Sequence, residues 1–131
     1  MTGKMIADAM RGYELTGGVF DPTVGPIVRA WISMRGEQPA TAAIREALTR
    51  VGSEKLILSA DYKTLRTRVA GMRLEPGGLR DGWVVKHITA VLASHRLVNY
   101  LINFRGACWY GAGVGPKDQP WRVLVNDHNT Q

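Results

Sequence analysis

Cysteine is nearly absent from this chain, since Cys108 is the only one among its 131 residues. One cysteine excludes a disulfide within the chain, and no residue near it has the spacing of a second metal ligand. We expect Cys108 to lie in a strand as a small buried residue. Long apolar runs are also missing: no segment has the length of a membrane span, and we expect no signal peptide in the first residues.

Acidic residues are fewer than basic ones, 11 against 17, which gives a formal net charge of +6. The basic residues are spread along the chain without a block, which predicts a solvated surface with a weak attraction to anions such as phosphates. No stripe of Lys and Arg alternates with stacking aromatics, so we expect no nucleic-acid partner. The length and an apolar content of 45% predict one globular domain over residues 1–131.

The most specific segment of the sequence is the stretch Thr16–Pro26, which joins two helix-like segments. Its adjacent glycines can take positive φ and so end a helix, and Pro26 suits the first turn of the next one. Asp21 or Thr23 can cap that next helix. The pattern predicts a rigid corner that holds Phe20 and Asp21 side by side, although a plain capped loop with Phe20 in the core is the ordinary alternative.

Apolar residues at spacings of three and four predict three amino-terminal helices. We expect the first at Lys4–Leu15 and the second at Val24–Met34, with their apolar faces packed together. The third is expected to begin at Thr41 as N-cap and to stop at Gly52.

A second Gly-rich segment, Leu74–Trp83, predicts a turn that opens a fourth helix ending near Ser94. Glycines before a helix can present backbone N–H groups to a phosphate, although most such turns bind nothing. Arg80 strengthens an anion site only slightly. The buried stripe of this helix is expected to be Val84, Ile88, Val91 and Leu92.

Alternating or continuous apolar runs predict the strands. They are expected at 56–58, 64–69, 98–104, 107–110 and 121–125, with an extended piece at 72–74 and a frayed end from Asn126. The fold class is therefore α+β: amino-terminal helices followed by a mostly antiparallel sheet with one helix packed on it.

Four landmarks of the sequence resemble the ApbE family of flavin transferases, which move FMN from FAD onto a threonine of a target protein. In order they are the corner Gly-Gly-Val-Phe-Asp-Pro-Thr-Val-Gly-Pro, the Gly-Gly turn opening a helix, the Val-Asn-Tyr-Leu-Ile-Asn segment, and Pro-Trp-Arg-Val. They span nearly the whole chain. The first and last match closely, and the middle two less so.

The resemblance implies a set of site residues. It places Val19, Phe20 and Asp21 of the corner against FAD, and it puts Glu75 where the family has a flavin-binding Asp. The Gly-rich turn contributes Gly77 and Gly78 to the same site. It also implies that the Gly78 backbone carbonyl faces a Mg²⁺ ion.

The sequence departs from the family at two charged positions. Asp81 stands where the family has a lysine, which reverses the charge near an anionic cofactor. Ala107 stands where a carboxylate is expected, after Arg105. The family's later segment, with a catalytic His and the Asp and Thr that hold magnesium, has no counterpart, so we expect a domain truncated at both ends, with its catalytic residues unknown.

Two functional hypotheses follow. In the first, the chain is part of a magnesium-dependent FAD:protein FMN transferase, which binds a flavin nucleotide and a target protein and is weak or inactive alone. In the second, it is a non-catalytic module that binds flavin, another nucleotide or a partner chain. Open strand edges make a homodimer plausible under both. Localisation is not predicted, although relatives are mostly exported or membrane-anchored.

Overall fold

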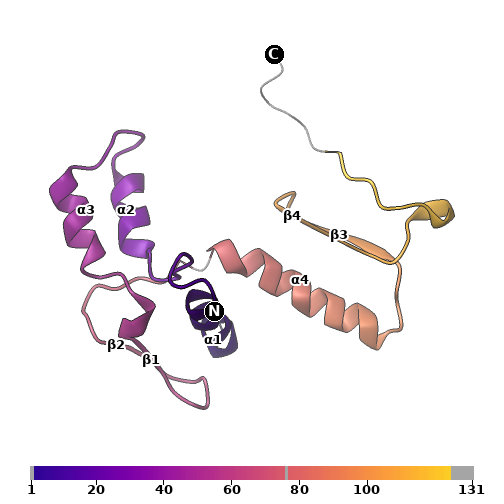
Figure 1. Ribbon diagram of the computed structural model, residues 1–131, viewed down its shortest axis with the longest axis horizontal. Helices are drawn as coiled ribbons and strands as arrows, with labels where there is room; N and C mark the ends of the chain where they lie inside the picture. The colour runs from indigo at the N-terminus through magenta and orange to yellow at the C-terminus, as the bar shows by residue number, and fades with distance from the viewer. Residues whose placement is uncertain (1, 76, 125–131) are drawn as a thin grey trace. The chain divides into compact units, whose positions relative to one another are not determined.

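A computed structural model describes residues 2–75 and 77–124. The chain divides into two compact units, Met1–Arg80 and Asp81–Gln131 (Figure 1). The described residues form helices and two small antiparallel sheets, so the α+β prediction is confirmed. The single sheet that the sequence suggested is instead two separate hairpins, one in each unit.

Three helices of the first unit lie where their apolar spacing predicts them. They are α1 (Gly3–Leu15), α2 (Gly25–Ser33) and α3 (Thr41–Leu48). Thr2 caps α1, because its hydroxyl accepts the Met5 N–H at 3.3 Å. The helix buries Met5, Ile6 and Ala9, which share one face.

The starts and partners of α2 and α3 differ from expectation. The N-cap of α2 is Val24 and that of α3 is Ala40, neither with a side-chain bond, so neither Asp21, Thr23 nor Thr41 is an N-cap. Helix α2 lies beside α3 (Figure 1). Its Trp31 and Ile32, expected to pack on the first helix, are exposed. The side of α2 that faces α3 carries smaller residues instead, among them Pro26, Ala30 and Ser33.

A short 3₁₀ turn, η1 (Ser53–Lys55), leads into the first hairpin, β1 (Leu56–Leu58) and β2 (Leu65–Thr67). The strands pair antiparallel, with Leu56 opposite Thr67. In the turn, the Asp61 carboxylate accepts the Ser59 hydroxyl at 2.6 Å and the Lys63 N–H at 3.1 Å. These bonds, the Ser59 hydroxyl first, lower the pKa of Asp61. The predicted strand–turn–strand is confirmed, with a shorter second strand.

The fourth helix, α4 (Gly77–Ser94), begins on the glycines themselves, so they form its first turn rather than a turn before it. Val85 is its buried residue, whereas Val91, predicted to be buried, is 58% exposed. No helix of the described ranges is long and apolar enough to cross a membrane.

The second hairpin pairs β3 (Tyr100–Phe104) with β4 (Cys108–Ala112) in antiparallel register. Cys108 lies in a strand as predicted, half-buried rather than buried. A short 3₁₀ turn, η2 (Pro116–Asp118), follows. The predicted last strand is wrong over 121–124, which is irregular because Trp121 donates its indole N–H to the Ala112 carbonyl at 2.9 Å rather than joining a ladder. Val125 and the polar end lie outside the described residues.

Gly25 is required by close packing at the start of α2. A Cβ there would lie 2.7 Å from the Arg73 Cβ and 2.8 Å from the Arg73 carbonyl oxygen, too close for any side chain. We expect Gly25→Ala to lower the free energy of unfolding by about 1–3 kcal/mol, measured by urea and thermal unfolding.

The matched control is Gly82→Ala on α4, where a Cβ would meet nothing within 4 Å. Alanine is the better helix former, so this variant is expected to be neutral or stabilised by up to about 1 kcal/mol. Equal destabilisation of both variants would contradict the packing of Gly25 on Arg73.

Candidate functional site

The diglycine bend after α1 has the backbone that the sequence predicts. Gly17 and Gly18 have φ values of +59° and +86°, and the Gly18 N–H donates to the Tyr13 carbonyl at 2.9 Å. The Tyr13 ring lies beside Gly18, and its hydroxyl donates to Glu54 at 3.1 Å. That bond to a carboxylate raises the pKa of Tyr13. The bend is thus held on one side by α1 and on the other by η1.

The Asp21 carboxylate organises the corner from inside. One oxygen, Oδ1, accepts the Thr23 N–H at 2.8 Å, the Thr23 hydroxyl at 2.7 Å and the Ser53 hydroxyl at 2.9 Å. The Thr23 hydroxyl in turn accepts the Gly52 N–H at 2.7 Å. Thr23 is 0% exposed and Ser53 is buried. At least this oxygen of Asp21 therefore has a structural role, joining residues about thirty positions apart.

Phe20 is half-buried and lies between two backbone glycines. A Cβ at Gly12 would be 3.1 Å from the ring, and one at Gly78 would be 3.4 Å from it. The Phe20 N–H donates to the Thr16 hydroxyl at 3.0 Å. Because both neighbours lack side chains, the ring fits between α1 and the first turn of α4.

Backbone contacts join the corner to the segment before α4. Val24 forms a parallel bridge with Arg73, and the Glu75 N–H donates to the Pro22 carbonyl at 2.6 Å. Glu75 is exposed, and a Cβ at Gly77 would lie 3.0 Å from its Oε1. The corner and the Gly-rich segment, far apart in sequence, thus meet within the unit Met1–Arg80.

The structure brings most of the implied site residues into this one region. Phe20 contacts Gly78. Glu75 is bonded to Pro22 through its backbone N–H, and Gly77 lies two residues after it. Val19 is 91% exposed and makes the rim of the corner. Contact of these residues with a flavin stays a prediction.

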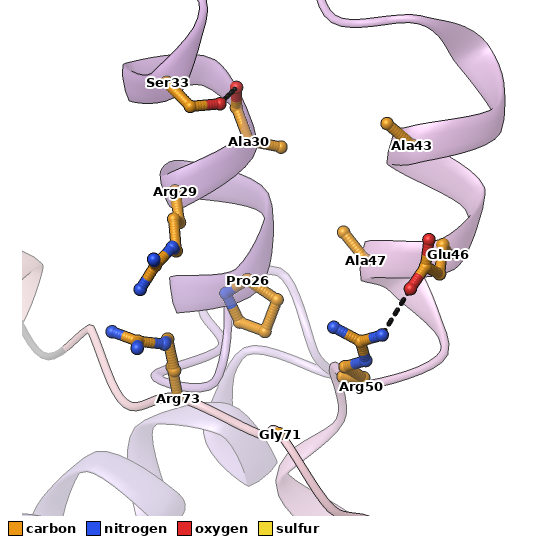
Figure 2. Close-up of a pocket in the computed structure, with 10 residues that line it drawn as sticks. All are labelled: Pro26, Arg29, Ala30, Ser33, Ala43, Glu46, Ala47, Arg50, Gly71 and Arg73. Carbon is orange, nitrogen blue, oxygen red and sulfur yellow. Dashed lines mark hydrogen bonds and ion pairs between the residues drawn. The ribbon is translucent and has the colours of Figure 1, made fainter.

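Two grooves flank α2 beside this region. The first, here called the arginine groove, has a volume of about 490 Å³, and Arg29, Arg50 and Arg73 line it together with small residues such as Ala47 (Figure 2). The second, called the Glu75 groove, has a volume of about 420 Å³. Its lining is Gly25, Val28, Arg29, Ile32, Ser33, Arg73, Leu74 and Glu75. Of the six implied flavin residues, only Glu75 lines either groove.

Sequence reasoning missed several residues of this region. Gly52 and Ser53 give no local signal, because their partners lie about thirty residues earlier. For Arg29 and Arg73 the sequence predicts only dispersed surface charge, and nothing in their spacing shows that they line the same grooves. The Asp21–Thr23 spacing is typical of an Asx turn and could have revealed the internal role of Asp21.

The described residues contain no group of three or more His, Cys, Asp or Glu side chains arranged to hold a metal ion. Gly78 lies in the first turn of α4, and no such group of the described residues accompanies its carbonyl there. These residues do not by themselves make a magnesium site, and Gly78 as a ligand stays a prediction. His87 has a packing role, with its Nδ1 2.8 Å from the Trp83 carbonyl oxygen and its ring against the indole.

A model of the ApbE family matches residues 1–131, and the chain belongs to that family. It is 32% identical to "FAD:protein FMN transferase" of Treponema pallidum and 26% identical to the Salmonella typhimurium protein of the same name. Those matches cover 89% and 92% of this chain. The chain spans 36% of the length of each of these two relatives.

Solved structures give the same fold. The apbe protein of Thermotoga maritima matches with a TM-score of 0.80 at 23% identity, covering 95% of this chain and 41% of that one. The H257G mutant of Flavin Transferase ApbE from Vibrio cholerae matches with a TM-score of 0.78 at 24% identity, covering 94% and 42%. At these identities the likeness shows the fold alone.

Thr23 is predicted to contribute more to stability than any exposed threonine. Thr23→Val keeps the shape but leaves the Gly52 N–H without an acceptor and removes a donor to Asp21, which we expect to cost about 1–3 kcal/mol in the free energy of unfolding. The measurement is chemical unfolding followed by circular dichroism.

Thr64→Val is the control, because Thr64 is exposed. Its effect is expected to stay within about 0.5 kcal/mol. A Thr23→Val variant as stable as the control would mean that the buried network does not hold the corner.

Proposed function

We propose that this chain forms the flavin-nucleotide-binding part of an FAD:protein FMN transferase, with FAD as the nucleotide and a threonine of a target protein as the FMN acceptor. Membership of the ApbE family and the names of the relatives support this activity. Because the chain spans little more than a third of those relatives, the whole reaction is assigned to the longer protein type.

The observation that carries the proposal is the meeting of the corner with the Gly-rich segment. Phe20 packs on bare backbone at Gly12 and Gly78, and because it is only half-buried, the rest of its ring offers an aromatic surface to a flavin. Glu75 is bonded to Pro22 only through its backbone N–H, and its side chain is exposed. Its carboxylate is therefore free to accept a hydrogen bond from the polar edge of a flavin. Asp21 acts as a positioning residue, since its Oδ1 fixes the backbone that carries Phe20.

In this reaction the hydroxyl oxygen of the acceptor threonine bonds to the FMN phosphorus of FAD, the pyrophosphate bond breaks, and AMP leaves. What this chain contributes is binding and orientation of the nucleotide. Developing charge on a transferred phosphoryl group needs positioned cations, and the acceptor threonine needs a base. We assign neither role to a residue of this chain.

A binding module without catalysis is the second candidate, and two sequence positions favour it. Asp81 replaces the lysine that the resemblance implies, and Ala107 replaces a carboxylate. A negative charge near a transferred phosphoryl group repels the charge that develops on it, so Asp81 disfavours the transfer step. A homodimer formed through open strand edges remains a further prediction for either candidate.

FAD binding tests the site. We expect weak, saturable quenching of FAD fluorescence by the wild-type chain, and Glu75→Gln is expected to weaken that affinity about tenfold, because a charged acceptor is lost. Glu37→Gln, an equal change of charge in an exposed turn, is the control. Wild-type affinity in Glu75→Gln, or equal losses in both variants, would argue against Glu75 as a flavin ligand.

FMN transfer distinguishes the two candidates. With FAD, Mg²⁺ and a threonine-bearing acceptor peptide, we expect this chain alone to give little or no flavinylated peptide by mass spectrometry. A full-length relative serves as the positive control. Robust turnover by the isolated chain would show that it holds a complete catalytic site and would remove the module candidate.

A further inference from the structure

The arginine groove presents positive charge that the described part of the protein does not neutralise. Three arginines line it, and Glu46 is its only acidic lining residue. Glu46 is paired with Arg50 across one turn of α3 (Figure 2). The side chains of Arg29 and Arg73 have no hydrogen-bond or ion-pair partner among the described residues, and in Figure 2 their guanidinium groups extend toward each other.

The backbone positions of Arg29 and Arg73 are fixed by regular structure, although their side chains have no partner among the described residues. Arg29 stands on α2, one helical turn after Gly25, and Arg73 is bridged to Val24 and packed against Gly25. Their Cα atoms therefore belong to one rigid patch, although the two side chains are exposed. Two like charges facing one groove repel each other, and a bound anion would remove that repulsion.

The chemistry of the lining selects the kind of anion. Two guanidinium forks match the tetrahedral oxygens of a phosphate, each giving paired N–H donors. Small walls at Ala30, Ala43 and Ala47 leave room for the group. The same two arginines also line the Glu75 groove, where Val28, Ile32 and Leu74 offer an apolar surface beside them.

We propose that Arg29 and Arg73, with Arg50 across the groove, form a binding site for a phosphoryl group of a small molecule. Pro26 is the one corner residue that lines the arginine groove, and of the implied flavin residues only Glu75 lies close, on the adjoining groove. The phosphoryl site does not depend on the flavin proposal. Its ligand is either inorganic phosphate or a phosphate monoester whose organic part lies along Val28 and Leu74.

The test is titration of inorganic phosphate and of phenyl phosphate into the purified chain, followed by calorimetry and by ³¹P NMR. We expect saturable binding that weakens when the ionic strength rises from about 0.01 M to about 0.1 M, because the arginines are exposed. Tighter binding of phenyl phosphate identifies a monoester ligand, and equal affinity identifies free phosphate. Both outcomes support the site, and absence of saturable binding overturns it.

Variants separate this site from general charge attraction. Arg29→Gln and Arg73→Gln are each expected to weaken phosphate binding about tenfold or more, since each removes a charge-assisted donor pair. Arg45→Gln on α3 removes the same charge outside the groove and is expected to change affinity less than about twofold. Glu46→Gln, which frees Arg50, is expected to tighten binding.

Equal losses in Arg45→Gln and Arg29→Gln would overturn the proposal, as would binding of an acidic peptide without binding of phosphate. FAD is titrated in parallel with every variant. Loss of FAD affinity in Glu75→Gln with unchanged phosphate affinity would keep the two sites distinct, and failure of FAD binding alone would count against the proposed function only.

Discussion

The buried hydrogen-bond network of Asp21, Thr23, Ser53 and Gly52 is the constraint on which the first unit depends. A fully buried threonine with both its donor and its acceptor satisfied holds together two segments that lie about thirty residues apart in the chain. Unpaired polar groups at this depth are costly, so the network permits one arrangement of the corner. The position of Phe20, one residue before Asp21, follows from it.

The remaining contacts extend this constraint toward the candidate sites. Once the corner is fixed, Pro22 accepts the Glu75 N–H and Val24 pairs with Arg73, so the Gly-rich segment must run alongside. That segment then places Glu75 close to the bare backbone near Phe20, and it places Arg73 in a groove that Arg29 and Glu75 also line. The corner and the arginine groove are thus both positioned by the backbone pairing of residues 22–24 with residues 73–75.

Local patterns in the sequence predicted the elements of this fold but not its long-range contacts. Spacings of three and four located α1, and positive-φ glycines located the bend, because both are short-range effects. Pairing of the strands into two hairpins depends on which segments meet in the folded chain. Trp121 lies in an irregular segment instead of the expected strand, and its indole N–H donates to the Ala112 carbonyl. The bond from Ser53 to Asp21 and the convergence of Arg29 with Arg73 are equally invisible to local patterns.

Contact between the corner around Phe20 and a flavin nucleotide is tested most directly by an NMR titration. In ¹⁵N-labelled protein, added FAD is expected to shift the amide signals of Gly12, Phe20 and Gly78 together and saturably, while Gly36 in the exposed turn after α2 stays unchanged. Shifts confined to residues outside the corner, or no shifts at concentrations that saturate a full-length relative, would contradict the account.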